Sequence, residues 1–81
     1  MTMKTITIEY FAILREHAGK SEESLATESE TARELFAELE QRYEFPVLNS
    51  MKVAVNDEFS DMDVLLADGD TIVFIPPVAG G

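Results

Sequence analysis

Apolar and polar residues alternate at the start of the chain. Ile6, Ile8 and Tyr10 are separated by single polar residues. This period of two is typical of a strand with one face on a core, and β-branched and aromatic residues favour strands. The sequence therefore predicts a first strand along these residues. Residues 11–18 lose the alternation and lead to a glycine, which predicts an irregular or single-turn connection into a weaker strand near 24–27.

The spacing of apolar residues then changes to that of a helix. Thr31 and Glu34 have the spacing of a capping box, in which their side chains satisfy free amide groups at a helix start. Glu38 and Arg42 are placed to form an ion pair one turn apart. Pro46 ends the helix, because proline disfavours helical backbone in the residue before it. The residues that share the predicted buried face are Ala32, Leu35, Phe36, Leu39 and Tyr43.

A strand is predicted again after the helix. Residues 52–55 are mostly apolar and β-branched, and they lead into a turn at Asn56-Asp57. The stretch 58–63 that follows is polar, which predicts a loop rather than a core element. Residues 64–66 return the chain to the core.

The last apolar run, residues 71–75, follows a tight turn at residues 68–70. It is apolar on both faces, as expected of a strand buried in the middle of a sheet or covered by a partner. We predict it to be the most buried strand. The order strand, strand, helix, strand, strand predicts an α+β domain with a mixed sheet packed against one main helix. We place this domain at residues 1–75 and an extended tail at residues 76–81.

Composition narrows the classes of function. The chain has 81 residues and a net charge of −10, which would repel nucleic acid and the anionic face of a membrane. We expect neither as a partner, and a basic protein surface is the natural complement, although such a charge also serves solubility alone. The start of the chain resembles neither a signal peptide nor a membrane span, so we expect a cytoplasmic protein. The absence of cysteine excludes thiolate catalysis and sulfur storage on a side chain.

The sequence predicts no metal site and no bound cofactor. His17 is the only histidine, and we interpret it as a solvated side chain, since a zinc site here would need mostly carboxylates. The acidic stretch from Asp57 to Asp63 does not fit a calcium loop, because Leu65 stands where a third acidic ligand belongs. There is no phosphate-cradling glycine loop, so we expect ATP to bind a separate activating enzyme.

Chemistry is instead predicted for the tail. Pro76 and Pro77 lack amide donors and hold an extended direction, so they point the chain away from the sheet. Residues 78–81 span roughly 13 Å when extended, and Gly80 and Gly81 have no side chain to obstruct a narrow channel. Terminal glycines are also common in frayed ends without function. Activation of the Gly81 carboxylate by adenylation, followed by displacement of AMP by a sulfur donor, would make the tail a carrier of one sulfur atom.

Several blocks of the chain, taken together, resemble the small subunit of molybdopterin synthase. The likeness runs nearly end to end, and the Pro-Pro-Val-Ala-Gly-Gly ending is its most specific element. The resemblance implies a ubiquitin-like β-grasp fold in which the final strand lies centrally, beside and parallel to the first. The blocks are Phe11-Ala12-Ile13-Leu14-Arg15-Glu16-His17-Ala18-Gly19, Ala54-Val55-Asn56, Leu66-Ala67-Asp68-Gly69-Asp70 and Ile75-Pro76-Pro77-Val78-Ala79-Gly80-Gly81.

The same resemblance implies a function and a set of site residues. An activating enzyme akin to the ubiquitin-activating type would adenylate Gly81, and a sulfur donor system would convert it to a thiocarboxylate. The tail would then enter the large subunit, within a heterotetramer, and give its sulfur to cyclic pyranopterin monophosphate to form the molybdopterin dithiolene. Catalytic side chains belong to the large subunit, so this chain would be a non-catalytic subunit of an enzyme complex. The partner-binding residues would be Ile75, where the family often has an aromatic, and Pro76, Pro77, Val78, Ala79 and Gly80.

Alternatives remain open at this stage. Phe59, apolar within an acidic loop, is either a further partner contact or a satellite core residue. The chain as a whole could instead carry sulfur for thiamin or another pathway, modify proteins through its C-terminus, or act as an interaction domain with an incidental terminus. The sequence does not identify the sulfur donor, the affinity for the large subunit, or self-association.

Overall fold

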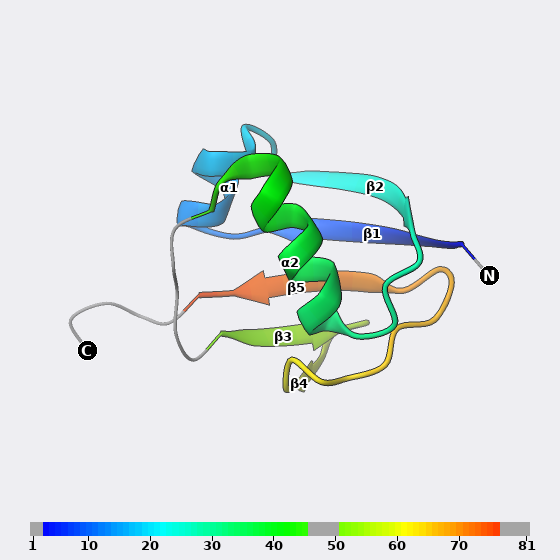
Figure 1. Ribbon diagram of the computed structural model, residues 1–81. Coiled ribbons are helices and arrows are strands. Elements are labelled where there is room, and N and C mark those ends of the chain that lie inside the picture. Colours follow the sequence, from blue (N-terminus) through cyan, green and yellow to red (C-terminus); the bar gives the residue numbers. More distant parts are fainter. Residues whose placement is uncertain (1–2, 46–50, 77–81) are drawn as a thin grey trace.

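The computed structural model describes residues 3–45 and 51–76. In these ranges five strands form one mixed sheet, and α2 lies across one face of it (Figure 1). The strand order is β2-β1-β5-β3-β4. No helix in these ranges is long and apolar enough to cross a membrane. The elements are β1 (Lys4–Tyr10), α1 (Ile13–Ala18), β2 (Glu22–Thr27), α2 (Ala32–Tyr43), β3 (Lys52–Val55), β4 (Glu58–Ser60) and β5 (Thr71–Ile75).

The last strand lies at the centre of the sheet, as predicted. β5 runs parallel to β1, with Ile8 opposite Ile72, and antiparallel to β3, with Ala54 opposite Val73. Every residue of β5 is buried or half-buried, which holds for no other described strand. Backbone hydrogen bonds to neighbours on both sides therefore fix β5 more firmly than the edge strands β2 and β4.

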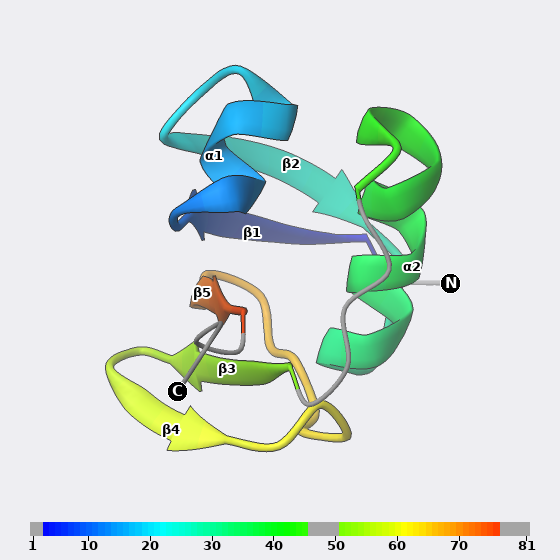
Figure 2. The ribbon, with the colours of Figure 1, turned by 90° about the vertical axis from the view of Figure 1, so that its left-hand side faces the viewer.

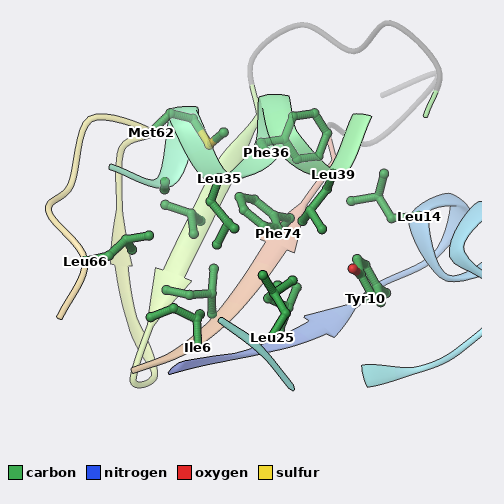
Figure 3. Packing of buried hydrophobic residues seen from close by; sticks show 14 of the residues in the cluster. Ile6, Tyr10, Leu14, Leu25, Leu35, Phe36, Leu39, Met62, Leu66 and Phe74 are labelled. Atoms are coloured by element: carbon green, nitrogen blue, oxygen red, sulfur yellow. The ribbon is translucent and has the colours of Figure 1, made fainter. Parts of the chain in front are cut away.

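The core fills the space between the sheet and α2 (Figure 3). The predicted helix face is confirmed, since Ala32, Leu35, Phe36 and Leu39 are buried and Tyr43 is half-buried against the same cluster. The ring of Phe36 lies 5.0 Å from that of Phe74 in β5, measured between centroids. Burial of such aromatic pairs is a main source of stability in a chain this small.

The start of α2 is capped largely as predicted. The Thr31 hydroxyl accepts a hydrogen bond from the Glu34 amide at 3.2 Å. The Glu34 side chain reaches one residue further back than a capping box requires, and accepts from the Glu30 amide at 3.1 Å. Both contacts satisfy amides at the start of the helix, where the backbone offers no acceptor.

The predicted ion pair between Glu38 and Arg42 is wrong. Among the described residues the Glu38 carboxylate instead accepts a hydrogen bond from the Thr27 hydroxyl at 2.7 Å. Thr27 is 2% exposed, so its hydroxyl needs a partner inside the protein. The carboxylate of Glu38 therefore joins α2 to the end of β2 rather than decorating the helix surface.

Two elements differ from the sequence prediction. Residues 13–18, predicted as an irregular or single-turn connection, form the six-residue helix α1, which is somewhat longer than a single turn. The polar stretch after residue 57 contains the short strand β4. β4 pairs with β3 through the backbone and needs no apolar alternation for that pairing. In the return to the core Leu66 is buried as predicted, whereas Leu65 is 73% exposed.

Side-chain hydrogen bonds join the turn after β3 to the loop before β5. Asn56 and Asp57 have left-handed backbone, with φ of 51° and 72°, and form the turn after β3. The Asn56 side chain donates to the Asp70 carboxylate at 2.8 Å and accepts from the Thr71 amide at 3.0 Å. Asp70 also accepts from the Ala67 amide at 2.8 Å. Two of the blocks noted in the sequence, around Asn56 and Asp70, thus hold the start of β5 in place.

Candidate functional site

The candidate site lies at the end of the sheet where β5 finishes, which we call the tail end (Figure 2). Because β1 and β5 are parallel and Tyr10 pairs with Phe74, the last residues of both strands meet there. Pro76 follows β5 directly and is half-buried. The other predicted tail residues, Pro77, Val78, Ala79, Gly80 and Gly81, lie outside the described residues, and their roles stay predictions.

Apolar side chains form a row across the face of the sheet that α2 leaves uncovered, which we call the outer face. Phe59 of β4 pairs with Ala54 of β3, and Ala54 pairs with Val73 of β5. Directly paired residues share a face, and Ile75 lies two residues beyond Val73 on that face. The structure therefore brings Phe59 and Ile75, two predicted partner contacts, to one face of the sheet.

Phe59 does not belong to the core. Its side chain is 79% exposed, and it is absent from the buried cluster under α2. The reading of Phe59 as a satellite core residue is therefore wrong. A phenylalanine exposed to this degree, in a row with other apolar residues, marks a surface that suits a protein partner.

Two further apolar residues near the tail end were missed by the sequence analysis. Phe11 and Ile13 are 53% and 38% exposed, and they flank Ala12 just after the end of β1. Ala12 has φ of 54° and ψ of −126°, a backbone region that residues other than glycine rarely adopt and that costs about 1–3 kcal/mol. Phe11 directly follows Tyr10, whose side chain faces the core. Since neighbouring residues of a strand point to opposite faces, this position was the only signal in the sequence that Phe11 is exposed.

A cluster of polar side chains closes the tail end on the side of α2. The hydroxyl groups of Tyr10 and Tyr43 both donate to the Glu23 carboxylate, the second at 2.6 Å. The ammonium group of Lys20 lies 3.5 Å from the other carboxylate oxygen of Glu23. These contacts tie the end of α2 to β1 and β2 with a single carboxylate.

The cluster shifts the pKa values of its members. Burial, and then the hydrogen bond to Glu23, raise the pKa of Tyr10. Burial alone would raise the pKa of Glu23, but the hydrogen bonds from Tyr10 and Tyr43 and the charge of Lys20 outweigh it and lower that pKa. Glu23 is therefore ionised throughout the physiological range and acts as a fixed acceptor.

We expect Glu23→Gln to destabilise the domain by about 1–3 kcal/mol at pH 7, because the hydroxyl groups of buried Tyr10 and half-buried Tyr43 lose a charged acceptor. A folded-state pKa below the unfolded one means that this stabilisation is present above the ordinary glutamate pKa of about 4.3 and is lost as pH falls through the lower, folded-state value. The difference in free energy of unfolding between the unmodified protein and Glu23→Gln should therefore become smaller below that pH. Urea unfolding across this range measures it, with exposed Glu22→Gln as the control. An equal gap at low and neutral pH would contradict the assignment.

A mixed five-stranded sheet, crossed by one long helix and with its last strand central beside the first, defines the described ranges as a ubiquitin-like β-grasp domain. The chain belongs to the ThiS family, which it matches over residues 8–81. The resemblance noted in the sequence is thereby confirmed at the level of the family.

Individual relatives agree with this assignment. The chain is 34% identical to the molybdopterin synthase sulfur carrier subunit of Aspergillus niger, over 99% of this chain and 98% of that protein. Its structure is similar to that of small archaeal modifier protein 1 from Methanosarcina acetivorans, with a TM-score of 0.76 and 25% identity over the whole of both chains. It is also similar to a chain in the complex of subunits 1 and 2 of the molybdopterin-converting factor from Helicobacter pylori, with a TM-score of 0.61 and 28% identity over 95% of this chain and 99% of that one.

Proposed function

We propose that this chain is the sulfur carrier subunit of molybdopterin synthase, with the carboxylate of Gly81 as the group that carries sulfur. The observation that carries the proposal is the central position of β5, which leads directly into the predicted tail. Membership of the ThiS family and similarity to a molybdopterin synthase sulfur carrier subunit support the same function.

The chemistry proceeds through two activated forms of the last residue. A carboxylate oxygen of Gly81 attacks the α-phosphorus of ATP, and pyrophosphate leaves, which gives an acyl adenylate. A hydrosulfide ion supplied by the donor system then attacks the carbonyl carbon, AMP leaves with the electron pair of the broken C–O bond, and the proton of the hydrosulfide is lost to solvent.

In the large subunit the sulfur of the resulting thiocarboxylate displaces an oxygen substituent from a carbon of cyclic pyranopterin monophosphate. Water then cleaves the bond between that sulfur and the Gly81 carbonyl carbon, which regenerates the Gly81 carboxylate. Two such transfers supply the two sulfur atoms of the dithiolene. ATP binds the activating enzyme, and this chain supplies no catalytic side chain.

The folded domain supports this chemistry by fixing the base of the tail. Hydrogen bonds from β1 and β3 hold β5 on both sides, so Ile75 and Pro76 start the tail from a rigid position. Pre-organisation of this kind lowers the entropic cost of placing the tail in a partner's active site. We propose that the outer face contacts the large subunit while the tail is inserted, and that the assembly is a heterotetramer.

We expect Phe59→Ser to weaken binding of the large subunit by about tenfold to thirtyfold, because exposed aromatic side chains often supply most of the binding free energy of an interface. Leu65→Ser is the matched control, since Leu65 is 73% exposed but lies outside the row on the outer face. Neither change should lower the stability of the isolated domain by more than about 0.5 kcal/mol. Isothermal titration of each variant with the large subunit measures the effect, and equal affinities for the two variants would exclude the outer face as the contact.

The test of the function itself is sulfur transfer between defined proteins. The thiocarboxylate form, mixed with the large subunit and cyclic pyranopterin monophosphate, should yield molybdopterin. It should yield no thiazole when it is mixed with a thiazole synthase and its other substrates. Transfer in the second reaction and not in the first would assign the chain to thiamin synthesis and overturn the proposal.

A second candidate function is protein modification, which similarity to small archaeal modifier protein 1 favours. Conjugation would join the Gly81 carbonyl to lysine amines of other proteins and produce covalent adducts of higher mass. Carriage of sulfur exchanges one oxygen atom for sulfur and leaves a protein of nearly the same mass. Mass spectrometry of the protein from cells distinguishes the two products.

A further inference from the structure

Basic residues are not spread evenly over this acidic domain. Strand register and helix order place most of them at the tail end, and we call this group the basic rim. It holds four of the six lysine and arginine residues of the chain: Arg15, Lys20, Arg42 and Lys52.

Three separate elements bring the rim to the base of the tail. Lys52 is directly paired with Ile75, so it shares the outer face with the last residue of β5. Arg15 lies in α1, which follows the end of β1 next to β5. Arg42 lies in the last turn of α2, one residue before Tyr43, which belongs to the hydrogen-bonded cluster at this end. Figure 2 shows α1, the end of α2 and the start of β3 around the end of β5.

The opposite end of the sheet is strongly acidic. It contains the loop after β2, the turn between β3 and β4, and the loop before β5. Lys4 also lies there, at the start of β1, and its ammonium group donates to the Ser29 carbonyl at 3.2 Å. The acidic residues at this end are Glu28, Glu30, Asp57, Glu58, Asp68 and Asp70.

Most of the rim is available to an approaching surface. Arg15, Arg42 and Lys52 are exposed, and within the described parts of the chain none of them makes an ion pair. Six acidic side chains lie at the tail end as well: Glu9, Glu16, Glu22, Glu23, Glu40 and Glu44. The rim sets four basic residues against these six, whereas Lys4 stands against the six acidic residues named at the opposite end, so the tail end is the less negative of the two.

We propose that the basic rim docks against acidic side chains at the mouth of the large-subunit channel and orients the domain tail end first. The proposal rests on the function proposed above. The net charge of the chain alone favours a basic partner surface. At the tail end the proposal predicts the opposite, an acidic partner surface.

Complementary charges of this kind act mainly on the rate of association. They steer the encounter and fix its orientation, and their effect falls as salt screens them over about 8 Å at physiological ionic strength. If the basic rim steers association, a charge reversal at the tail end slows association with the large subunit more than the same reversal at the opposite end of the sheet.

Two matched pairs of charge reversals test the proposal in stopped-flow association with the large subunit of the same organism. Lys52→Glu and Lys4→Glu each change the first residue of a strand. Arg15→Glu and Arg33→Glu each change an exposed arginine of a helix, although Arg33, unlike Arg15, is paired with Asp63 at 2.9 Å. We expect each tail-end variant to associate about 3- to 10-fold more slowly than the unmodified protein at low salt, and each control within about 1.5-fold. The difference should disappear at about 1 M salt.

Equal effects on the association rate within each pair, or faster association of the tail-end variants, would contradict the proposed role of the basic rim. Circular dichroism confirms that each variant is folded before its rate is measured. Sulfur transfer at saturating large subunit separates this result from the proposed function, because steering changes the rate of encounter and leaves transfer within the complex unchanged. Absence of transfer with the unmodified protein would count against the function and not against the rim.

Discussion

Removal of Gly81 lowers sulfur transfer by about 100-fold or more and leaves the domain folded. The variant still ends in a carboxylate, on Gly80, but that group lies about 3.5 Å short of the position the channel requires. Misplacement of a reacting group by about 1 Å can already cost a factor of 100 in rate. Thiocarboxylate formation followed by mass spectrometry, together with the yield of molybdopterin, measures the loss.

Gly81→Ala is the control for this deletion, because it keeps the carboxylate in place and adds only a methyl group. Gly81→Ala should reduce sulfur transfer less than the deletion does. Any loss that it does cause would report how tightly the channel fits around the last residue. The unfolding midpoint in urea should match that of the unmodified protein in both cases, since Gly81 lies beyond the last strand. Full transfer by the deleted protein would remove Gly81 from the mechanism.

Phe74→Ala destabilises the domain by about 3–5 kcal/mol. Phe74 is fully buried in the central strand and its ring contacts that of Phe36 in α2, so the change opens a cavity between sheet and helix. Because small domains have a total stability of roughly 5–15 kcal/mol, much of the variant population should be unfolded under mild denaturing conditions. Urea unfolding followed by circular dichroism measures the difference.

Val73→Ala provides the comparison within the same strand. Val73 lies on the outer face and is half-buried, so the loss should be about 1 kcal/mol or less. A similar loss at both positions would mean that the two faces of β5 are buried alike, which contradicts the arrangement of core and outer face described here.

Most of the fold was predictable from the sequence because its main elements carry strong local signals. Ile6, Ile8 and Tyr10 alternate with polar residues, and Thr31 and Glu34 mark the start of a helix with a regular apolar face. β4 carries no such signal, since it is short and is held by backbone pairing with β3. The contact between Glu38 and Thr27 depends on which side of α2 faces the end of β2, and this is a property of the packed molecule.

The candidate site was predictable in part. Phe59 was noticeable as an aromatic residue within an acidic stretch, but its exposure and its alignment with Ala54 and Val73 required the strand register. Phe11 was missed because it continues an apolar run after Tyr10. The polarity of charge was not predictable either, because Arg15, Arg42 and Lys52 are far apart in the sequence and meet only through the order of the strands.

The proposed function depends on the chemistry of the last carbonyl group, and the intact mass of the protein reports on that group most directly. The purified protein is incubated with its activating enzyme and sulfur donor, with and without ATP. We expect a mass increase equal to the exchange of one oxygen atom for sulfur only when ATP is present, and fragmentation should locate the sulfur on Gly81. An unchanged mass with all components present, or sulfur located elsewhere in the chain, would contradict the central claim.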